Sequence, residues 1–292
     1  MQQQWQVTRD ISYCGSARSK SGRAVIRLVE NATGRLGMIR RADGYQAQVA
    51  QGQDFWQVMV RRYGLSLDVA AGALDNIPRT GPLVVVANHP YGILDGLIMG
   101  HILSALRGDF RVIAHQVFHK AEDLRQVILP ISFDETTAAT RQNLATRKAA
   151  LAYLDGGGAI GVFPGGTVAT APRLFGQPMD PVWRNFTARM IARSHATVIP
   201  IFFDGQNSRL FQLASHLHSN LRMALLIKEF RKRVDQPVRI AIGDPIEHHE
   251  IAPRANDPKR MMDFLRERTY SLSPRSLDAR RYGFEFEEKY KR

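Results

Sequence analysis

Short apolar segments alternate along this chain with longer segments in which apolar positions recur every three or four residues. The short segments are rich in β-branched residues and are bounded by Gly, Pro or Asp, which is typical of buried strands. They cover residues 65–70, 83–87, 110–114, 159–163, 197–203 and 238–242. The longer segments predict helices over residues 94–106, 136–154, 183–195, 209–218, 221–233 and 258–270. The alternation predicts an α/β fold, with a mixed, largely parallel sheet flanked by helices.

The first 64 residues show amphipathic helices and no strand pattern. One predicted helix surrounds Val25 and Leu28, and residues 31–34 are expected to end it. A second helix, capped by Asp54, carries apolar residues on one side and Arg61 and Arg62 at its end. Its apolar side, formed by Phe55, Trp56, Met59 and Val60, suits either a lipid headgroup layer or the protein core. We therefore expect residues 1–64 to form an N-terminal helical segment that is a candidate for membrane association. We expect residues 65–250 to form the main α/β domain, and residues 251–292 to add a C-terminal helix and basic tail to it.

The composition is that of a soluble globular protein, with 44% hydrophobic residues. Cys14 is the only cysteine, so no intrachain disulfide can form and a reducing compartment is expected. Neither a signal-peptide core nor an apolar run of about 20 residues is present, which is the length that spans a bilayer. These features predict a cytoplasmic protein and leave contact with a membrane open. Together with the basic, amphipathic N-terminal helices, we expect peripheral association with the inner face of the cell membrane.

The formal net charge of +13 predicts a polyanionic partner. Nucleic acid, anionic lipid and a phosphorylated substrate all meet that description. No zinc-finger spacing or ribonucleoprotein motif occurs, so we expect no nucleic acid and favour a lipid surface or an anionic substrate. His115 and His119 are four residues apart, but nothing near them completes a ligand set, and no metal is expected.

Candidate catalytic residues follow the predicted strand 83–87, in the motif NHPYGILDG at residues 88–96. In α/β sheets, sites lie in loops at the carboxyl ends of strands. A carboxylate at Asp95 would hold the imidazole of His89 as a general base, and Pro90 and Gly92 would turn the loop back between them. The alternative is that Asp95 only caps the next helix and His89 is an ordinary loop residue.

A second candidate loop follows the predicted strand 159–163. Gly165 and Gly166 let backbone N–H groups approach a ligand, and Thr167 and Thr170 add hydroxyl groups. Together with Arg173, this loop is suited to bind a phosphate or an oxyanion, although it lacks the Gly-Lys-Ser/Thr of a Walker loop. The strand 197–203 contains Pro200, and either lines an acyl pocket or forms part of the core.

Three segments together, NHPYGILDG, FPGGT and VIPIFF, resemble the glycerophospholipid acyltransferase family, which is PlsC-like and synthesises phosphatidate. The resemblance covers residues 65–245 approximately. It implies transfer of an acyl group from a thioester, acyl-CoA or acyl carrier protein, to a hydroxyl of a lyso-lipid, with no further cofactor. It assigns the base to His89 with Asp95, and acceptor binding to the segment around Thr167.

The chain departs from the family pattern at three places. Five residues separate His89 from Asp95, one more than is usual, and Gly165 and Val168 stand where the family has Glu and Arg. Similar variants occur in the bacterial branch with hemolysin-like proteins and lyso-ornithine lipid acyltransferases. The acceptor is thus expected to be lysophosphatidate-like or a lyso-ornithine lipid. The expected substrate-binding residues are Asn88, Gly92, Gly165, Gly166, Thr167 and Arg173, with Arg111 and Lys120 as further candidate cations.

Two other functions fit parts of the pattern. A Ser-His-Asp lipid hydrolase would use the same histidine and a glycine-rich oxyanion loop, but no Gly-x-Ser-x-Gly elbow occurs. A non-enzymatic basic protein would bind anionic membranes through its N-terminal helices.

Overall fold

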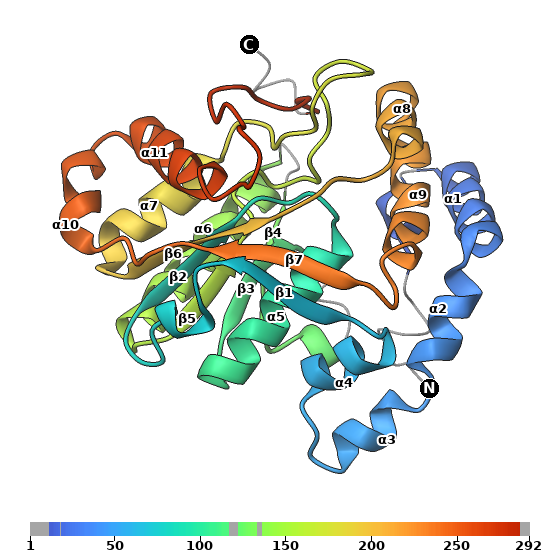
Figure 1. The fold of residues 1–292 in the computed structure, drawn as a ribbon, viewed down its shortest axis with the longest axis horizontal. Coiled ribbons are helices and arrows are strands. Elements are labelled where there is room, and N and C mark those ends of the chain that lie inside the picture. The colour runs from blue at the N-terminus through green and yellow to red at the C-terminus, as the bar shows by residue number, and fades with distance from the viewer. Residues whose placement is uncertain (1–11, 18, 117–121, 133–135, 287–292) are drawn as a thin grey trace.

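The protein is described by a computed structural model that covers residues 12–17, 19–116, 122–132 and 136–286 (Figure 1). Within these residues one sheet of seven strands has the order β1-β7-β6-β2-β5-β3-β4. Neighbouring strands are parallel except for the antiparallel pair β6–β7. The strands are β1 (Ser66–Ala71), β2 (Leu83–Ala87), β3 (Arg111–His115), β4 (Ile128–Ile131), β5 (Ala159–Val162), β6 (Thr197–Phe203) and β7 (Pro237–Ile242). The predicted mixed, largely parallel sheet is confirmed.

Helices cover both faces of the sheet and extend beyond one of its ends (Figure 1). Helices α4 and α5 pack on one face, whereas α6, α7 and α11 pack on the other. Helices α1, α8 and α9 stand side by side at the edge of the molecule. The helices are α1 (Lys20–Thr33), α2 (Arg35–Ala42), α3 (Tyr45–Ala50), α4 (Phe55–Arg62), α5 (Ile93–Arg107), α6 (Thr137–Asp155), α7 (Asn185–Ser194), α8 (Arg209–Leu217), α9 (Ser219–Arg231), α10 (His248–Ile251) and α11 (Pro258–Tyr270).

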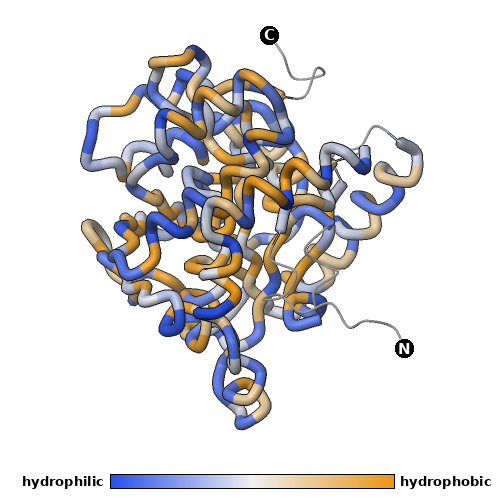
Figure 2. The backbone as a smooth tube through the Cα atoms, turned by 90° about the vertical axis from the view of Figure 1, so that its right-hand side faces the viewer, coloured by the Kyte–Doolittle hydropathy of each residue, from blue (hydrophilic) through white to orange (hydrophobic). Residues whose placement is uncertain are grey.

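Strand β2 lies in the middle of the sheet and is buried on both faces. Leu83, Val85 and Ala87 pack into the core with α5, and Val84 and Val86 pack into the core on the opposite face. A strand covered on both sides needs apolar residues at every position, which explains its uninterrupted apolar sequence. Figure 2 shows the same trend, with hydrophobic residues concentrated along the central strands. The residues that follow β2 are thus held at the centre of the sheet.

The structure adds elements that the sequence pattern did not predict. β4 contains Pro130 and forms the edge of the sheet, where a missing N–H is tolerated. Helices α2 and α3 follow α1, which ends at Gly34 with a φ of 126°. Pro200, in contrast, does not interrupt β6, since it pairs with Val86 within the parallel ladder.

Helix α4 turns its apolar side toward the core. Trp56 and Met59 are buried, and the Trp56 ring contacts Phe55 and Phe110 at centroid distances of 5.3 and 5.7 Å. Gly100 of α5 makes room for that indole, because a Cβ there would lie 2.2 Å from it. Asp54 caps α4 as predicted. Of the two interpretations of this helix, packing on the core is therefore correct and the lipid-facing one is wrong. Among the described helices, none is long and apolar enough to cross a membrane.

Candidate active site

The site forms where β2, β5 and β6 end. β2 runs parallel to both neighbours, so the loops that leave the three strands meet at one edge of the sheet. Asn88 joins two of these strand ends: its Oδ1 accepts the N–H of Phe203 (2.7 Å) and its Nδ2 donates to the Phe203 carbonyl (3.0 Å). The buried amide of Asn88 thus extends the pairing of β2 with β6 and fixes the start of the loop.

His89 and Asp95 are brought together as predicted. The Nδ1 atom of His89 lies 3.0 Å from Oδ2 of Asp95, and the carboxylate is fully buried. The same Oδ2 accepts the N–H groups of Tyr91 (2.8 Å) and Gly92 (3.0 Å) at the start of α5. Gly92 has a φ of 91°, which glycine adopts without strain. Asp95 therefore caps the helix and faces the histidine, so the two roles considered for it coexist.

The His89–Asp95 contact is close but not linear. Nδ1 of His89 and Oδ1 of Asp95 are buried, and no described residue completes a well-aligned hydrogen bond with either atom. Contacts of this kind often tighten only when substrate binds.

The backbone and ring of His89 are held from three sides. Its N–H donates to Oδ1 of Asp180 (3.1 Å), and its carbonyl accepts the N–H of Ala169 (2.7 Å). Phe163 stacks on the imidazole with a centroid distance of 4.4 Å and an interplanar angle of 28°. The side chain is 18% exposed while Nδ1 is buried, so Nε2 is the ring nitrogen on the more accessible side.

The glycine loop packs against the buried carboxylate of Asp180. Gly166 closes a turn with a φ of 70°, and its N–H donates to the Phe163 carbonyl (3.0 Å). The side chain of Asp180 lies against Gly165 and accepts the indole N–H of Trp183 (2.9 Å). Burial raises the pKa of Asp180, although the nearby Arg266 guanidinium and its hydrogen-bond donors oppose that rise.

The side chain of Arg222, on α9, forms hydrogen bonds with the segment around Thr167. Its guanidinium donates to Oγ1 of Thr167 (2.9 Å), to Oγ1 of Thr170 (3.1 Å) and to the Val168 carbonyl (2.8 Å). Among the described residues no carboxylate forms an ion pair with it, and burial lowers its pKa to about 9. Phe286 lies over the guanidinium, 4.2 Å from its centre. A buried cation that has no counter-ion in the described part of the chain therefore lies next to Thr167.

Three expected cations lie elsewhere or outside the described residues. Arg173 lies on an exposed loop, where it lines a groove with α8. Arg111 begins β3, so it lies at the opposite edge of the sheet. Lys120 lies outside the described residues. The structure also describes no group of His, Cys, Asp and Glu side chains that would hold a metal.

Asp180 and Arg222 belong to none of the motifs identified in the sequence. The only signal for them was indirect, because Gly165 and Val168 stand where the related family has Glu and Arg. Asp180 packs against the first of these positions, and Arg222 binds the carbonyl of the second. In this chain, charged groups from distant segments thus reach both positions.

Comparison with known proteins identifies the family to which this chain belongs. A profile of the family described as Acyltransferase matches residues 48–280, and this range includes the whole site. The chain belongs to this acyltransferase family. The protein is therefore an enzyme, and the non-enzymatic alternative is wrong.

Two curated relatives are 21% and 25% identical to the acyltransferase over the aligned part of the chain. The lyso-glycine lipid O-acyltransferase of Phocaeicola vulgatus is 25% identical over 215 residues, which cover 71% of this chain and 74% of that protein. The protein of the same name from Bacteroides thetaiotaomicron is 21% identical over 215 residues, covering 71% and 76%. The crystal structure of the 1-acyl-sn-glycerophosphate acyltransferase PlsC from Thermotoga maritima aligns with a TM-score of 0.43 and 16% identity, over 84% of this chain and 97% of that one.

Proposed function

We propose that this acyltransferase moves a fatty acyl group from an acyl thioester, acyl-CoA or acyl carrier protein, to the hydroxyl of a lyso-lipid. The observation that carries the proposal is the 3.0 Å contact of His89 Nδ1 with the buried Asp95, which leaves Nε2 toward the acceptor. Both curated relatives are named for transfer to a lyso-glycine lipid, which supports a lipid acceptor.

The reaction requires one proton to move twice. The acceptor hydroxyl hydrogen-bonds Nε2 of His89, which takes its proton as the oxygen attacks the thioester carbonyl. Asp95 stabilises the resulting imidazolium, and general-base help of this kind contributes about 10²–10⁴-fold. When the tetrahedral intermediate collapses, the C–S bond breaks and the imidazolium returns the proton to the leaving thiolate. The products are the ester and the free thiol.

We propose that a backbone N–H group near Gly165 stabilises the oxyanion of that intermediate. The N–H of Gly166 is used by the Phe163 carbonyl, whereas no described residue accepts the N–H of Gly165. A backbone donor held in place before reaction is the type of group that stabilises developing negative charge.

The headgroup of the acceptor is proposed to be anionic and to bind at Thr167. The guanidinium of Arg222 lies 2.9 Å from the Thr167 hydroxyl, and no described carboxylate neutralises it. Its positive charge favours binding of a carboxylate or phosphate next to Thr167. The names of the curated relatives favour lyso-glycine lipid, an acyl-amino-acid acceptor, over lysophosphatidate. Lyso-ornithine lipid, which is also an acyl-amino-acid lipid, is our second candidate. Because such acceptors reside in a bilayer, we propose that the enzyme works at an anionic membrane surface on its cytoplasmic side.

The test is product analysis by mass spectrometry with the purified full-length protein. Acyl-CoA and acyl carrier protein donors are offered against lyso-glycine lipid, lyso-ornithine lipid and lysophosphatidate. We expect a di-acylated product and free thiol in equal amounts, and none from a folded His89→Ala variant. Undiminished turnover by His89→Ala would overturn the mechanism.

The hydrolase alternative predicts a different product from the same incubations. It requires a serine nucleophile, and no described serine contacts His89. Release of free fatty acid in place of acyl transfer, with inhibition by a serine-directed phosphonate, would favour hydrolysis over our proposal.

A further inference from the structure

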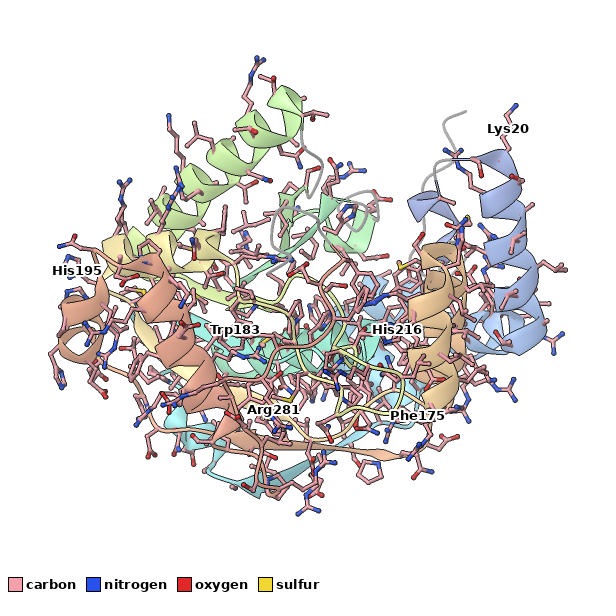
Figure 3. The ribbon with its side chains drawn as sticks, turned by 90° about the horizontal axis from the view of Figure 1, so that it is seen from above. Lys20, Phe175, Trp183, His195, His216 and Arg281 are labelled. Atoms are coloured by element: carbon pink, nitrogen blue, oxygen red, sulfur yellow. The ribbon has the colours of Figure 1, made fainter. Side chains whose placement is uncertain are left out.

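An exposed apolar surface lies beside the site, on helix α8 and the loop of residues 172–176. Phe175 at the tip of the loop is 85% exposed and Leu217 of α8 is 67% exposed. The other exposed apolar residues of this surface are Leu174, Leu210 and Leu213. The loop and α8 enclose a groove of about 820 Å³. Figure 3 shows Phe175 and His216 at this end of the molecule, well away from His195.

Helix α8 is turned so that its leucines face outward. Leu210, Leu213 and Leu217 have the spacing of one helix face and are exposed, whereas the opposite face buries Phe211, Gln212, Ala214 and Ser215. The outer face of a surface helix normally carries charged and polar residues. An outward stripe of three leucines marks an interaction site when it adjoins a further apolar group such as Phe175.

Hydrogen bonds fix α8 in this orientation. The side chain of Gln212 accepts the N–H of Ala171 (2.9 Å), and Nε2 of His216 lies 2.9 Å from the carbonyl of Ala171. Both bonds join the buried side of α8 to the chain just before the exposed loop. These hydrogen bonds therefore hold the three leucines on the solvent side of α8.

The same chain segment leads directly to the catalytic histidine. Ala169 donates its N–H to the carbonyl of His89, and Ala171, two residues on, binds α8. Phe175 follows four residues later at the tip of the loop. The exposed loop is thus tied through two hydrogen bonds to the segment that follows the glycine loop of residues 165–167. We therefore assign the surface to a bilayer, the source of a lipid acceptor, and not to a protein partner.

The charges at this surface have the sign that anionic lipids require. Arg173 lies in the loop and Arg209 begins α8, both are exposed, and neither forms an ion pair with a described residue. Exposed apolar side chains flanked by free arginines are typical of segments that lie in the headgroup layer. The overall charge of +13 acts in the same direction.

We propose that the exposed apolar surface docks this acyltransferase on an anionic bilayer, with Phe175 and Leu217 entering the boundary between headgroups and acyl chains. The inference rests on the proposed lipid acceptor. It moves the expected membrane contact away from α4, whose apolar side is buried, to a loop and helix next to the site.

Vesicle co-sedimentation of the full-length protein tests the proposal, with phosphatidylcholine vesicles that contain or lack phosphatidylglycerol. We expect binding to the anionic vesicles, and at least a 10-fold weaker affinity for the Phe175→Asp/Leu217→Asp double variant, since two large apolar groups no longer leave water. Leu144→Asp is the matched control, because Leu144 is 45% exposed on α6, which lies apart from α8. This control should bind as the wild type does.

Three results would overturn the proposal. The double variant could bind vesicles with the affinity of the wild type, or binding could be lost only in Leu28→Asp. The double substitution could also dissociate a dimer and leave vesicle binding unchanged. Leu28 is 70% exposed on α1 and represents the N-terminal alternative. Turnover of a water-soluble short-chain acceptor is measured in parallel for the wild type and the double variant. A wild type that binds vesicles but acylates no acceptor would refute the proposed function alone, whereas equal binding by both proteins with normal turnover would refute the docking surface alone.

Discussion

The carboxylate of Asp180 fills the space that a side chain at position 165 would need. A Cβ added to Gly165 would lie 3.1 Å from Cβ and 3.3 Å from Cγ of Asp180. Asp180 uses its two carboxylate oxygens for the N–H of His89 and the indole N–H of Trp183. A side chain at position 165 would therefore press on Asp180, which also holds the backbone of His89.

The first prediction is that Gly165→Glu destabilises the protein. The added side chain overlaps Asp180, and overpacking of this kind costs about 1–3 kcal/mol; a second buried carboxylate adds repulsion. The free energy of unfolding, measured by urea denaturation, should fall accordingly. Adding Asp180→Ala should restore part of the loss, so that the two changes together cost less than their sum.

Gly37→Ala is the control for this pair. A Cβ at Gly37, on helix α2, would meet no atom within 4 Å, and alanine favours a helix by about 1 kcal/mol. This variant should be as stable as the wild type or more so. A Gly165→Glu protein of unchanged stability would contradict the packing of Asp180 against the loop.

The second prediction concerns the pH dependence of stability. Burial raises the pKa of Asp180 in the folded protein above the ordinary aspartate value of about 3.9. The folded state thus holds this proton more tightly, and the corresponding stability is present below that value and is lost as the pH rises through the folded pKa. Asp180→Asn lacks this contribution. The unfolding free energy of the wild type minus that of Asp180→Asn should fall with rising pH from about pH 4 and then level off.

Urea denaturation of the two proteins over a series of pH values measures this difference. Other titrating groups contribute equally to both proteins and cancel. A difference that increases with pH would show that the Asp180 pKa is lowered, and would mean that its hydrogen-bond donors and Arg266 outweigh burial.

The sequence predicted those parts of the fold and site that depend on neighbouring residues. The strand before Asn88 and the turn at Gly92 are local, so the pairing of His89 with Asp95 followed from the spacing alone. Strand β4 escaped prediction because it has four residues and includes Pro130, which disfavours a strand unless it lies at an edge. Its position at the edge is a tertiary property.

The charged groups around the glycine loop depend on tertiary packing and so were not predicted. Arg222 lies 55 residues after Thr167 in the chain, and only the contact of α9 with the loop brings them together. Arg173 is nearer in sequence but lies on the exposed loop. Nothing in the local sequence pattern distinguishes a loop arginine such as Arg173 from one that is buried in a helix, such as Arg222.

The third prediction separates the two roles of Asp95. Asp95→Asn keeps an oxygen for the N–H groups of Tyr91 and Gly92, but removes the charge that faces Nδ1 of His89. We expect kcat to fall by about 10²–10⁴-fold, with little change in the melting temperature. Asp95→Ala should lose the same activity and about 1 kcal/mol of stability in addition, because the helix cap is also removed.

Asp54→Ala is the matched control for the cap. Asp54 accepts the N–H of Gln57 at the start of α4, and also the hydroxyl of Ser104 near the end of α5 that is remote from Asp95. Its loss should cost about 1 kcal/mol and leave kcat unchanged. If Asp95→Asn were fully active, Asp95 would be a helix cap alone and the base assignment of His89 would need another partner.

The fourth prediction concerns Arg222 and the acceptor headgroup. Arg222→Lys keeps a positive charge but lacks the planar fork that binds Thr167, Thr170 and the Val168 carbonyl together. We expect KM for an anionic, water-soluble short-chain acceptor to rise about 10-fold or more, which is the effect of losing one hydrogen bond to a charged group, while KM for the thioester donor stays constant. Arg173→Ala should leave both values near those of the wild type, since Arg173 lies in the exposed loop. Steady-state kinetics with one substrate varied and the other saturating measure these constants. A larger rise in the acceptor KM for Arg173→Ala than for Arg222→Lys would place the headgroup at the loop arginine instead.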